Sequence, residues 1–174
     1  MNGLVGVIGA ATSLAESQLM STPAVRALEQ AGVEHLLHAC EVDEAVGDGY
    51  GVAVAAAIGA QPDQVFKTLM AVVDGGHVVA IIPVSARLSM KRLAAAAGAK
   101  KAEMADPADA ERLTSYVTGG ISPLGQRRRQ RTFVDQTAFT RDRVYVGAGK
   151  RGLQVELGVS DLLTLTEGTL ADLT

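Results

Sequence analysis

The order of apolar and polar positions along the chain predicts short strands interspersed with single helices. Residues 65–73 and 77–82 are apolar runs joined by Asp74-Gly75-Gly76, which is the pattern of a β-hairpin. Residues 153–157 alternate between aliphatic and polar side chains, so they predict a half-buried strand with one solvent face. Further strands are expected at residues 33–42, 100–104, 132–134 and 143–146.

Helices are predicted where a capping side chain precedes an apolar stripe and a glycine follows it. Thr22-Pro23 begins the first helix and Gly32 ends it, while Asp106-Pro107 begins a later helix that runs to about Tyr116. Three more are expected between residues 51 and 59, from 89 to 97, and from 160 onwards. Hairpins mixed with single helices indicate an α+β domain with a mixed, largely antiparallel sheet.

The length of 174 residues fits one ordinary domain, which we place at residues 21–174. Residues 1–20 are expected to be a flexible extension, because they contain no Lys or Arg and so lack the charged start of a signal peptide. The single cysteine, Cys40, excludes an internal disulfide and fits a reducing cytoplasm. No apolar run reaches the roughly 18 residues that span a bilayer, so no membrane association is expected.

Charge is distributed unevenly along the chain. Residues 87–151 contain fourteen basic and six acidic residues, whereas the rest of the chain contains two basic and thirteen acidic ones. A protein with this division is able to present a positive face to a phosphate-rich partner despite its acidic total. The alternative is a fold that mixes the two sets on its surface.

Residues 118–126 form a glycine-rich stretch, Thr-Gly-Gly-Ile-Ser-Pro-Leu-Gly-Gln, that predicts a loop of defined shape. Paired glycines let another backbone or a ligand approach closely. The ring of Pro123 fixes its own φ and favours an extended conformation at Ser122. The stretch is followed at once by four arginines, Arg127, Arg128, Arg129 and Arg131. Together they suggest a pocket for an anionic group, and the alternative is a surface turn beside a solvated basic strand edge.

Residues 147–152, Gly-Ala-Gly-Lys-Arg-Gly, match the dinucleotide-binding fingerprint letter for letter. That fingerprint has to open a helix, because the pyrophosphate sits on the helix N-terminus. Here the strand at residues 153–157 follows, so we reject the match. What remains is a glycine turn with two cations, Lys150 and Arg151, suited to binding phosphate through backbone amides and side chains.

Lys67 interrupts an apolar strand, where Val65, Leu69 and Ala71 are expected on the same face. Burial of an unpaired ammonium is costly, so the side chain should reach solvent, an acid or an anionic ligand. The alternative is an edge-strand lysine that discourages aggregation. The three histidines and Cys40 have no metal-ligand spacing, so no metal or other cofactor is expected.

Several ordered segments resemble the YbaK/EbsC-like aminoacyl-tRNA deacylases, most of all the branch that acts on Cys-tRNA(Pro). The resemblance covers about residue 21 to the end of the sequence. Six segments carry it: Ser21-Thr22-Pro23-Ala24, residues 62–69 (Pro-Asp-Gln-Val-Phe-Lys-Thr-Leu), Gly98-Ala99-Lys100-Lys101, Met104-Ala105-Asp106-Pro107, residues 119–126 and residues 149–152. It implies an α+β fold with a partly closed mixed barrel. It also implies trans-editing, the release of cysteine mischarged onto proline tRNA, with Cys-tRNA(Cys) as a further substrate. The implied partners are that tRNA and, in a ternary complex, prolyl-tRNA synthetase, and the implied location is the cytoplasm.

The resemblance also implies the site residues. Lys67 occupies the position of the functional lysine, and the expected substrate-binding residues are Tyr50, Gly51, Thr68, Gly119, Gly120, Ile121, Ser122, Pro123, Gly147, Gly149, Lys150 and Arg151. The four arginines of residues 127–131 are expected to bind tRNA. This chain departs from near relatives at three positions: Gly147 replaces a Ser, Cys40 a Tyr, and Gln154 an Asp found in some of them.

The histidines and the cysteine form no recognisable nucleophile–base pair, so catalysis has to depend on positioning and electrostatics. A cysteinyl ester carries its own thiol, with a pKa near ~8.5, which is able to attack the adjacent carbonyl. Lys67 would then balance charge at the ester or the terminal phosphate. Three other functions stay open: a deacylase for Ala or Ser, a non-catalytic RNA-binding module, and an enzyme that binds a small nucleotide.

Overall fold

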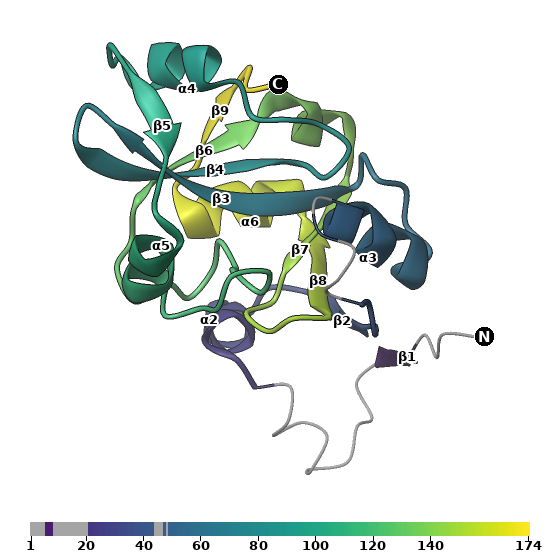
Figure 1. Cartoon of the computed structure of the whole chain (residues 1–174). Helices are drawn as coiled ribbons and strands as arrows, with labels where there is room; N and C mark the ends of the chain where they lie inside the picture. The colour runs from purple at the N-terminus through teal and green to yellow at the C-terminus, as the bar shows by residue number, and fades with distance from the viewer. Residues whose placement is uncertain (1–5, 9–20, 44–46, 48) are drawn as a thin grey trace.

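A computed structural model of the chain describes residues 6–8, 21–43, 47 and 49–174 (Figure 1). Its nine strands form one sheet in the order β1-β2-β8-β7-β3-β4-β6-β9, and β5 pairs with β3 outside that order. The strands are β1 (Gly6–Ile8), β2 (His35–Ala39), β3 (Val65–Val73), β4 (Gly76–Pro83), β5 (Ala102–Met104), β6 (Arg131–Asp135), β7 (Arg143–Gly147), β8 (Leu153–Gly158) and β9 (Thr169–Ala171). The helices are α2 (Pro23–Ala31), α3 (Tyr50–Ile58), α4 (Met90–Ala97), α5 (Pro107–Thr114), α6 (Val159–Thr166) and the 3-10 helix η2 (Gln136–Thr140).

The sheet is mixed, as expected. Five strand pairings among the described residues are antiparallel, and three, β3 with β7, β4 with β6 and β6 with β9, are parallel. The α+β class is therefore confirmed. Within the described residues the terminal strands β1 and β9 of the sheet do not pair, so "partly closed barrel" describes this open sheet only loosely.

The parallel contact between β3 and β7 is short, with Val65 opposite Tyr145 and Phe66 opposite Val146. Figure 1 shows β7 and β8 running across the direction of β3 and β4. The sheet therefore changes direction at this junction, and one edge of β3 loses its neighbour immediately after Phe66.

Local chemistry explains the elements that the sequence predicts. In the β3–β4 turn, Asp74 and Gly75 both have positive φ, 46° and 86°, as a two-residue hairpin turn of matching twist requires. Thr22 Oγ1 accepts a hydrogen bond of 3.2 Å from the Val25 N–H at the start of α2. Ser89 caps α4 and Asp106 caps α5 in the same way.

Apolar clusters cover both faces of the sheet. One contains Phe66 and Met70 of β3 with Leu162 of α6, and the other contains Ile82 of β4 and Leu93 of α4. A smaller cluster joins α3 to the first residue of β3 and to Val84. Because closely packed apolar side chains fill these clusters, the sheet provides a rigid support for the loops at its edge.

The structure differs from the expectations in a few places. Gln154 was expected on the solvent face of its strand but is 7% exposed, and it lines a cavity together with Tyr50 and Val54 of α3. Helix η2 and strand β9 were not expected, and the strand predicted at residues 100–104 is limited to β5. Of the extension proposed at residues 1–20, the structure describes β1, which pairs with β2, and the remainder lies outside the described residues.

None of the helices that the structure describes combines the length and apolar character needed to cross a membrane.

Candidate functional site

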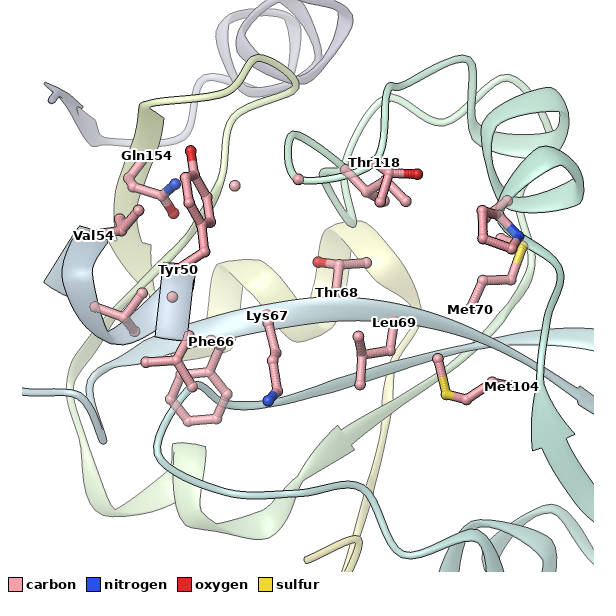
Figure 2. Close-up of a pocket in the computed structure, with 18 of the residues that line it drawn as sticks. Tyr50, Val54, Phe66, Lys67, Thr68, Leu69, Met70, Met104, Thr118 and Gln154 are labelled. Carbon is pink, nitrogen blue, oxygen red and sulfur yellow. The ribbon is translucent and has the colours of Figure 1, made fainter. Parts of the chain in front are cut away.

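A cavity of about 430 Å3 lies over the middle of β3 (Figure 2). It is bounded by α3, α5 and two glycine loops, residues 117–125 and 147–152. Its volume is within the roughly 300–1,000 Å3 range of small-ligand pockets. The described residues that line it are Gly47, Tyr50, Gly51, Val54, Val65, Phe66, Lys67, Thr68, Leu69, Met70, Val84, Met104, Ala105, Pro107, Ala110, Thr118, Gly119, Ile121, Gly147 and Gln154.

The cavity opens where β3 has an unpaired edge. The pairing with β7 ends at Phe66 and the pairing with β5 begins at Ala71, so residues 67–70 lack a neighbouring strand on that side among the described residues. The Met70 carbonyl points to this edge, since it accepts a 3.0 Å hydrogen bond from the Ala105 N–H. Backbone groups alternate along a strand, so the N–H and C=O of Thr68 point the same way. A ligand in the cavity therefore meets a backbone donor and acceptor at one residue.

The Thr68 side chain adds a third polar group at this point. Its Oγ1 is buried and has no hydrogen-bond partner among the described atoms. Figure 2 shows Thr68 pointing from β3 towards Thr118 on the other side of the cavity. A buried hydroxyl without a partner costs about 1–3 kcal/mol, so this is a position where a bound polar group restores a missing hydrogen bond.

Lys67 leaves β3 on the side opposite to Thr68, together with Leu69 (Figure 2). It lines the cavity and is half-buried. β3 lies between β7 and β4 in the strand order, but Lys67 belongs to the stretch of β3 that has no neighbouring strand on the cavity side among the described residues. The functional and the edge-strand interpretations of Lys67 therefore both stay predictions. Among the described lining residues, Lys67 is the one with a charged side chain, and Tyr50 carries the one phenol.

The two glycine loops, residues 117–125 and 147–152, contact each other through their backbones. A Cβ on Gly120 would lie 2.9 Å from the Arg151 nitrogen, and a Cβ on Gly147 would lie 2.6 Å from the Ile121 oxygen. The Arg151 Nε donates a 2.8 Å hydrogen bond to the Thr118 carbonyl. The absence of side chains at these glycines is therefore what lets the loops close one wall of the cavity.

Tyr116 connects both loops from beneath. Its hydroxyl donates a 2.7 Å hydrogen bond to the Leu124 carbonyl, and a Cβ on Gly149 would lie 2.5 Å from its ring. Burial raises the pKa of Tyr116 to about 12, so the phenol stays a donor at neutral pH. Tyr116 thereby fixes the first loop at its far end and supports the second.

Side chains from outside the loops hold the cavity rim. The Gly152 N–H donates to the Tyr50 hydroxyl at 3.1 Å, and Gly51 approaches Val84 so closely that a Cβ would lie 2.6 Å from its Cγ1. The Glu111 carboxylate accepts bonds of 2.8 and 2.9 Å from the N–H and hydroxyl of Thr118. These two bonds from Thr118 lower the pKa of Glu111.

The structure brings part of the expected site together. Of the residues named from the sequence, the cavity is lined by Lys67, Tyr50, Gly51, Thr68, Gly119, Ile121 and Gly147. The others do not line it. Ser122 and Pro123 are buried in the first loop, where Ser122 Oγ accepts a bond from the Leu124 N–H. Gly120, Lys150 and Arg151 form the contact between the loops, and Gly149 packs against the Tyr116 ring.

The four arginines of residues 127–131 do not line the cavity. Arg129 forms an ion pair with Glu167 and also bonds the Leu165 carbonyl, while Arg131 donates to the Ala97 carbonyl and stacks 4.7 Å above the Phe133 ring. All four arginines are exposed, so these contacts distinguish Arg129 and Arg131 from Arg127 and Arg128, and exposure does not. At least six basic residues of region 87–151 form ion pairs with acidic residues. The basic and the acidic residues are therefore partly intermixed on the surface.

Sequence reasoning missed several lining residues. Val54, Met70, Met104, Pro107, Ala110 and Thr118 were not named as candidates, and Gln154 was noted only as a departure. Apolar residues in a binding site carry no chemical signature in a sequence. Met104 and Pro107 belong to a segment that carries the resemblance, Met104-Ala105-Asp106-Pro107, but no role in the site was assigned to that segment.

No metal centre is found in the described part of the chain, where His, Cys, Asp and Glu form no group of three or more able to hold an ion. Residues 147–152 lead directly into β8 and not into a helix, so the rejection of the dinucleotide fingerprint is confirmed. At Gly147, where the resemblance leads us to expect a Ser, the Ile121 carbonyl leaves no room for a Cβ. Cys40 is half-buried, and burial raises the pKa of its thiol, which makes it a poor nucleophile at neutral pH.

Comparison with known proteins adds independent information. Residues 50–165 match the family model described as the aminoacyl-tRNA editing domain. A protein of Enterococcus faecalis, EbsC, named as a candidate Cys-tRNA(Pro)/Cys-tRNA(Cys) deacylase, is 41% identical over 122 residues, which are 70% of this chain and 74% of that protein. The Ser/Thr-tRNA deacylase ProXp-y of Escherichia coli is 29% identical over 111 residues, 61% of this chain and 66% of that protein.

A solved structure shares the fold. It is described as a candidate trans-editing enzyme for prolyl-tRNA synthetase, and it superposes with a TM-score of 0.74 at 24% identity, covering 88% of this chain and 98% of that one. At this identity the likeness concerns the fold alone.

Proposed function

Because the chain belongs to the aminoacyl-tRNA editing domain family, we propose that it is an aminoacyl-tRNA deacylase that releases cysteine from mischarged Cys-tRNA(Pro). The observation that carries this proposal is the chemistry of the cavity lining. Its described residues supply one ammonium, one phenol, hydroxyls and backbone amides, and no carboxylate, imidazole or thiol. A site whose described lining has no carboxylate, imidazole or thiol suits a substrate that brings a nucleophile with it.

The proposed reaction begins at the thiol of the cysteinyl group. The thiolate attacks the ester carbonyl, the bond to the terminal ribose oxygen breaks, and that oxygen takes up the proton that the thiol released. The amino acid leaves as a strained four-membered thiolactone, which water opens to free cysteine. A thiol is a few per cent ionised near neutral pH, so no protein base is required to create the nucleophile.

The protein's part in this reaction is to position the ester and to stabilise charge. The ammonium of Lys67, on a long and rotatable side chain, stabilises the negative charge that develops on the ester oxygens. The hydroxyl and backbone groups of Thr68 bind the polar atoms of the aminoacyl group. Backbone amides near Gly119 and Gly147 orient the carbonyl. Holding the thiol against the carbonyl in a fixed geometry is the largest contribution such a site can make.

The tRNA itself is proposed to contact the protein through phosphate-binding cations beside the cavity. Lys150 and Arg151 belong to the loop that forms the cavity wall, and Arg127 and Arg128 are exposed. The fold likeness to a candidate trans-editing enzyme for prolyl-tRNA synthetase supports that synthetase as a partner that hands over the mischarged tRNA. Such a reaction takes place in the cytoplasm, where tRNA is charged.

A second candidate substrate is a seryl or threonyl ester. It is favoured by the 29% identity to a Ser/Thr-tRNA deacylase and by Gln154, a buried amide in the lining that is able to bond a hydroxyl. In that case water has to act as the nucleophile, since a hydroxyl is almost fully protonated at neutral pH.

Single-turnover deacylation of tRNA(Pro) charged with Cys, Ser, Ala or Pro distinguishes these substrates. We expect Cys-tRNA(Pro) to be cleaved fastest. Lys67→Ala should reduce that rate at least ~100-fold, which corresponds to roughly 2.7 kcal/mol of transition-state stabilisation. Lys91→Ala, an exposed lysine on α4, is the matched control and should keep the full rate.

If all four esters decay at the spontaneous rate, the protein is not a deacylase of these substrates. If Ser-tRNA is cleaved faster than Cys-tRNA, the second candidate replaces the first. A Lys67→Ala variant with the full rate and an unchanged melting temperature would show that Lys67 is a structural residue.

A further inference from the structure

The start of helix α2 contacts both glycine loops from outside the cavity. Thr22 Oγ1 donates a hydrogen bond of 2.5 Å to the carbonyl of Ala148 in the second loop. In the first loop, a Cβ on Gly125 would lie 2.8 Å from the Ala24 nitrogen. Figure 1 shows α2 beside the turn between β7 and β8. Residues 21–24, to which the proposed function gives no role, therefore support two loops that bound the cavity.

The Thr22 hydroxyl makes two hydrogen bonds at once. A hydroxyl has one donor and two acceptor positions. Its proton goes to the Ala148 carbonyl, and its oxygen accepts a 3.2 Å bond from the Val25 N–H in the first turn of α2. Thr22 is 8% exposed, so water has little access to replace either bond, and the β-branched side chain rotates little about χ1. Thr22 thus joins the end of a helix to a loop in one defined geometry.

The second glycine loop needs such bonds because its own residues restrict its backbone little. Gly147 and Gly149 flank Ala148, and a glycine populates both signs of φ. The Ala148 N–H donates a 3.0 Å bond to the Leu153 carbonyl, which fixes the peptide plane between Gly147 and Ala148. The bond from Thr22 fixes the next plane, between Ala148 and Gly149. Together the two bonds set how the backbone of Gly147 faces the cavity that it lines.

We propose that Thr22 is a positioning residue of the deacylation site, whose hydroxyl holds the second glycine loop where its backbone meets the ester. The proposal rests on the proposed function, in which backbone amides near Gly147 orient the ester carbonyl. Thr22 is not among the described residues that line the cavity, and the match to the aminoacyl-tRNA editing domain covers residues 50–165. The contact therefore makes α2, which precedes the matched segment, a part of the structure that shapes the site.

Three substitutions of Thr22 separate the bond to the loop from the helix cap. Thr22→Ser keeps both bonds. Thr22→Asp keeps an acceptor for the Val25 N–H, but at neutral pH it has no proton to donate to the Ala148 carbonyl. Thr22→Val has nearly the shape of threonine and loses both bonds. Ser89→Ala is the matched control, because Ser89 Oγ caps α4 by accepting a 3.3 Å bond from the Arg92 N–H and does not line the cavity.

Cleavage of Cys-tRNA(Pro) gives the first readout. We expect Thr22→Val and Thr22→Asp to lower kcat about 10- to 100-fold and to change KM less than about threefold, because a displaced loop misplaces the reacting carbonyl while most of the tRNA binds elsewhere. Thr22→Ser should retain most of the kcat. Ser89→Ala should keep the full kcat, although the loss of its cap lowers the melting temperature by about 2–4 °C.

Hydrogen exchange in the full-length protein without tRNA gives a second readout, which does not depend on activity. The reference is the set of β4 amides, which report global unfolding because β4 pairs on both sides. Relative to them, the N–H groups of Ala148 and Leu153 should exchange about tenfold faster in Thr22→Val and Thr22→Asp, because the loop opens locally. Their relative exchange should be unchanged in Thr22→Ser and in Ser89→Ala.

The outcomes distinguish the positioning role from the proposed function. If the unmodified protein cleaves Cys-tRNA(Pro) and Thr22→Asp keeps its kcat, or if Ser89→Ala loses as much kcat as Thr22→Val, the positioning role is wrong while the deacylase activity stands. Unchanged exchange of the loop in every variant would also overturn the role. If the unmodified protein cleaves no ester but the loop exchanges faster only in Thr22→Val and Thr22→Asp, Thr22 anchors the loop and the deacylase activity is wrong. Should Thr22→Val fail to fold, Thr22→Ser and Thr22→Asp, which both keep the cap, decide the question.

Discussion

The two glycine loops differ in structural role from the arginine run, residues 127–131, although that run directly follows the first loop in the sequence. The loops touch each other backbone to backbone and form one wall of the cavity. Within the run, Arg129 and Arg131 are bound to Glu167 and to the backbone at Leu165 and Ala97. The comparison teaches that a cluster of charge in a sequence reports little about a binding site when the fold supplies partners for it. Glycine spacing is the more reliable sign here, because close backbone approach excludes other residues.

The largest effect is expected from adding one methyl group between the loops, which tests whether their close approach shapes the site. Gly120→Ala would place a Cβ 2.9 Å from the Arg151 nitrogen and 3.0 Å from the Lys150 carbonyl carbon, which forces the loops apart. We expect an activity loss of about 100-fold, as a shift of ~1 Å in a positioned substrate produces. Overpacking should also lower the free energy of unfolding by roughly 1–3 kcal/mol. Deacylation rates and urea titrations measure the two effects.

Gly76→Ala is the matched control for that change. In the β3–β4 hairpin an added Cβ would meet only the Val73 oxygen at 3.6 Å, which is an ordinary contact. Its activity and stability should stay close to those of the unmodified protein. If Gly120→Ala is equally harmless, the close approach of the loops does not shape the site.

Tyr116 is the next test, because it holds the first loop through Leu124. Tyr116→Phe keeps the ring beneath Gly149 but removes the hydrogen bond, and should cost about 1–3 kcal/mol of stability. The pKa of Tyr116 is raised to about 12 from its usual 10.0. When folding raises the pKa of a group, its contribution to the free energy of unfolding is complete at pH values below the pKa of the unfolded state. That contribution is lost as the pH rises towards the pKa of the folded state.

Unfolding measurements between pH 9 and pH 12 check the sign of this effect. The unmodified protein should lose stability above pH 10, and part of that loss should be missing in Tyr116→Phe. A loss of equal size in both proteins would mean that other groups cause the alkaline transition and that the phenol does not hold the loop.

The arginine run gives the smallest expected effect, and it divides into two pairs. Replacing Arg127 and Arg128, which are exposed, with Ala should lower the slope of log affinity against log salt for tRNA by roughly 0.7–0.9 for each lost phosphate contact. Replacing Arg129 and Arg131 should leave the slope nearly unchanged and lower the melting temperature. Equal changes in slope for the two pairs would show that the contacts of Arg129 and Arg131 yield to tRNA.

Much of the fold could be predicted from local chemistry. The Asp74-Gly75 turn, the caps at Thr22, Ser89 and Asp106, and the apolar runs of β3 and β4 depend on neighbouring residues, and the structure has each of them as expected. The burial of Gln154 could not be predicted, because α3, which lines the same cavity, is far away in the sequence. The glycine loops and Lys67 were found as candidates. Met104 belongs to a segment that carries the resemblance but was not assigned to the site, and its place beside the cavity depends on the pairing of β5 with β3.

The central claim is that the substrate supplies the nucleophile to a cavity that lacks one among its described residues. Single-turnover rates with cysteinyl-tRNA(Pro) and with S-methylcysteinyl-tRNA(Pro) test it most directly, with binding of both measured separately. We expect the thiol substrate to be cleaved and the S-methyl substrate to bind but to stay intact, and Cys40→Ala to retain full activity. Cleavage of both esters at the same rate would contradict the claim, and would mean that water or a group of the protein attacks the carbonyl.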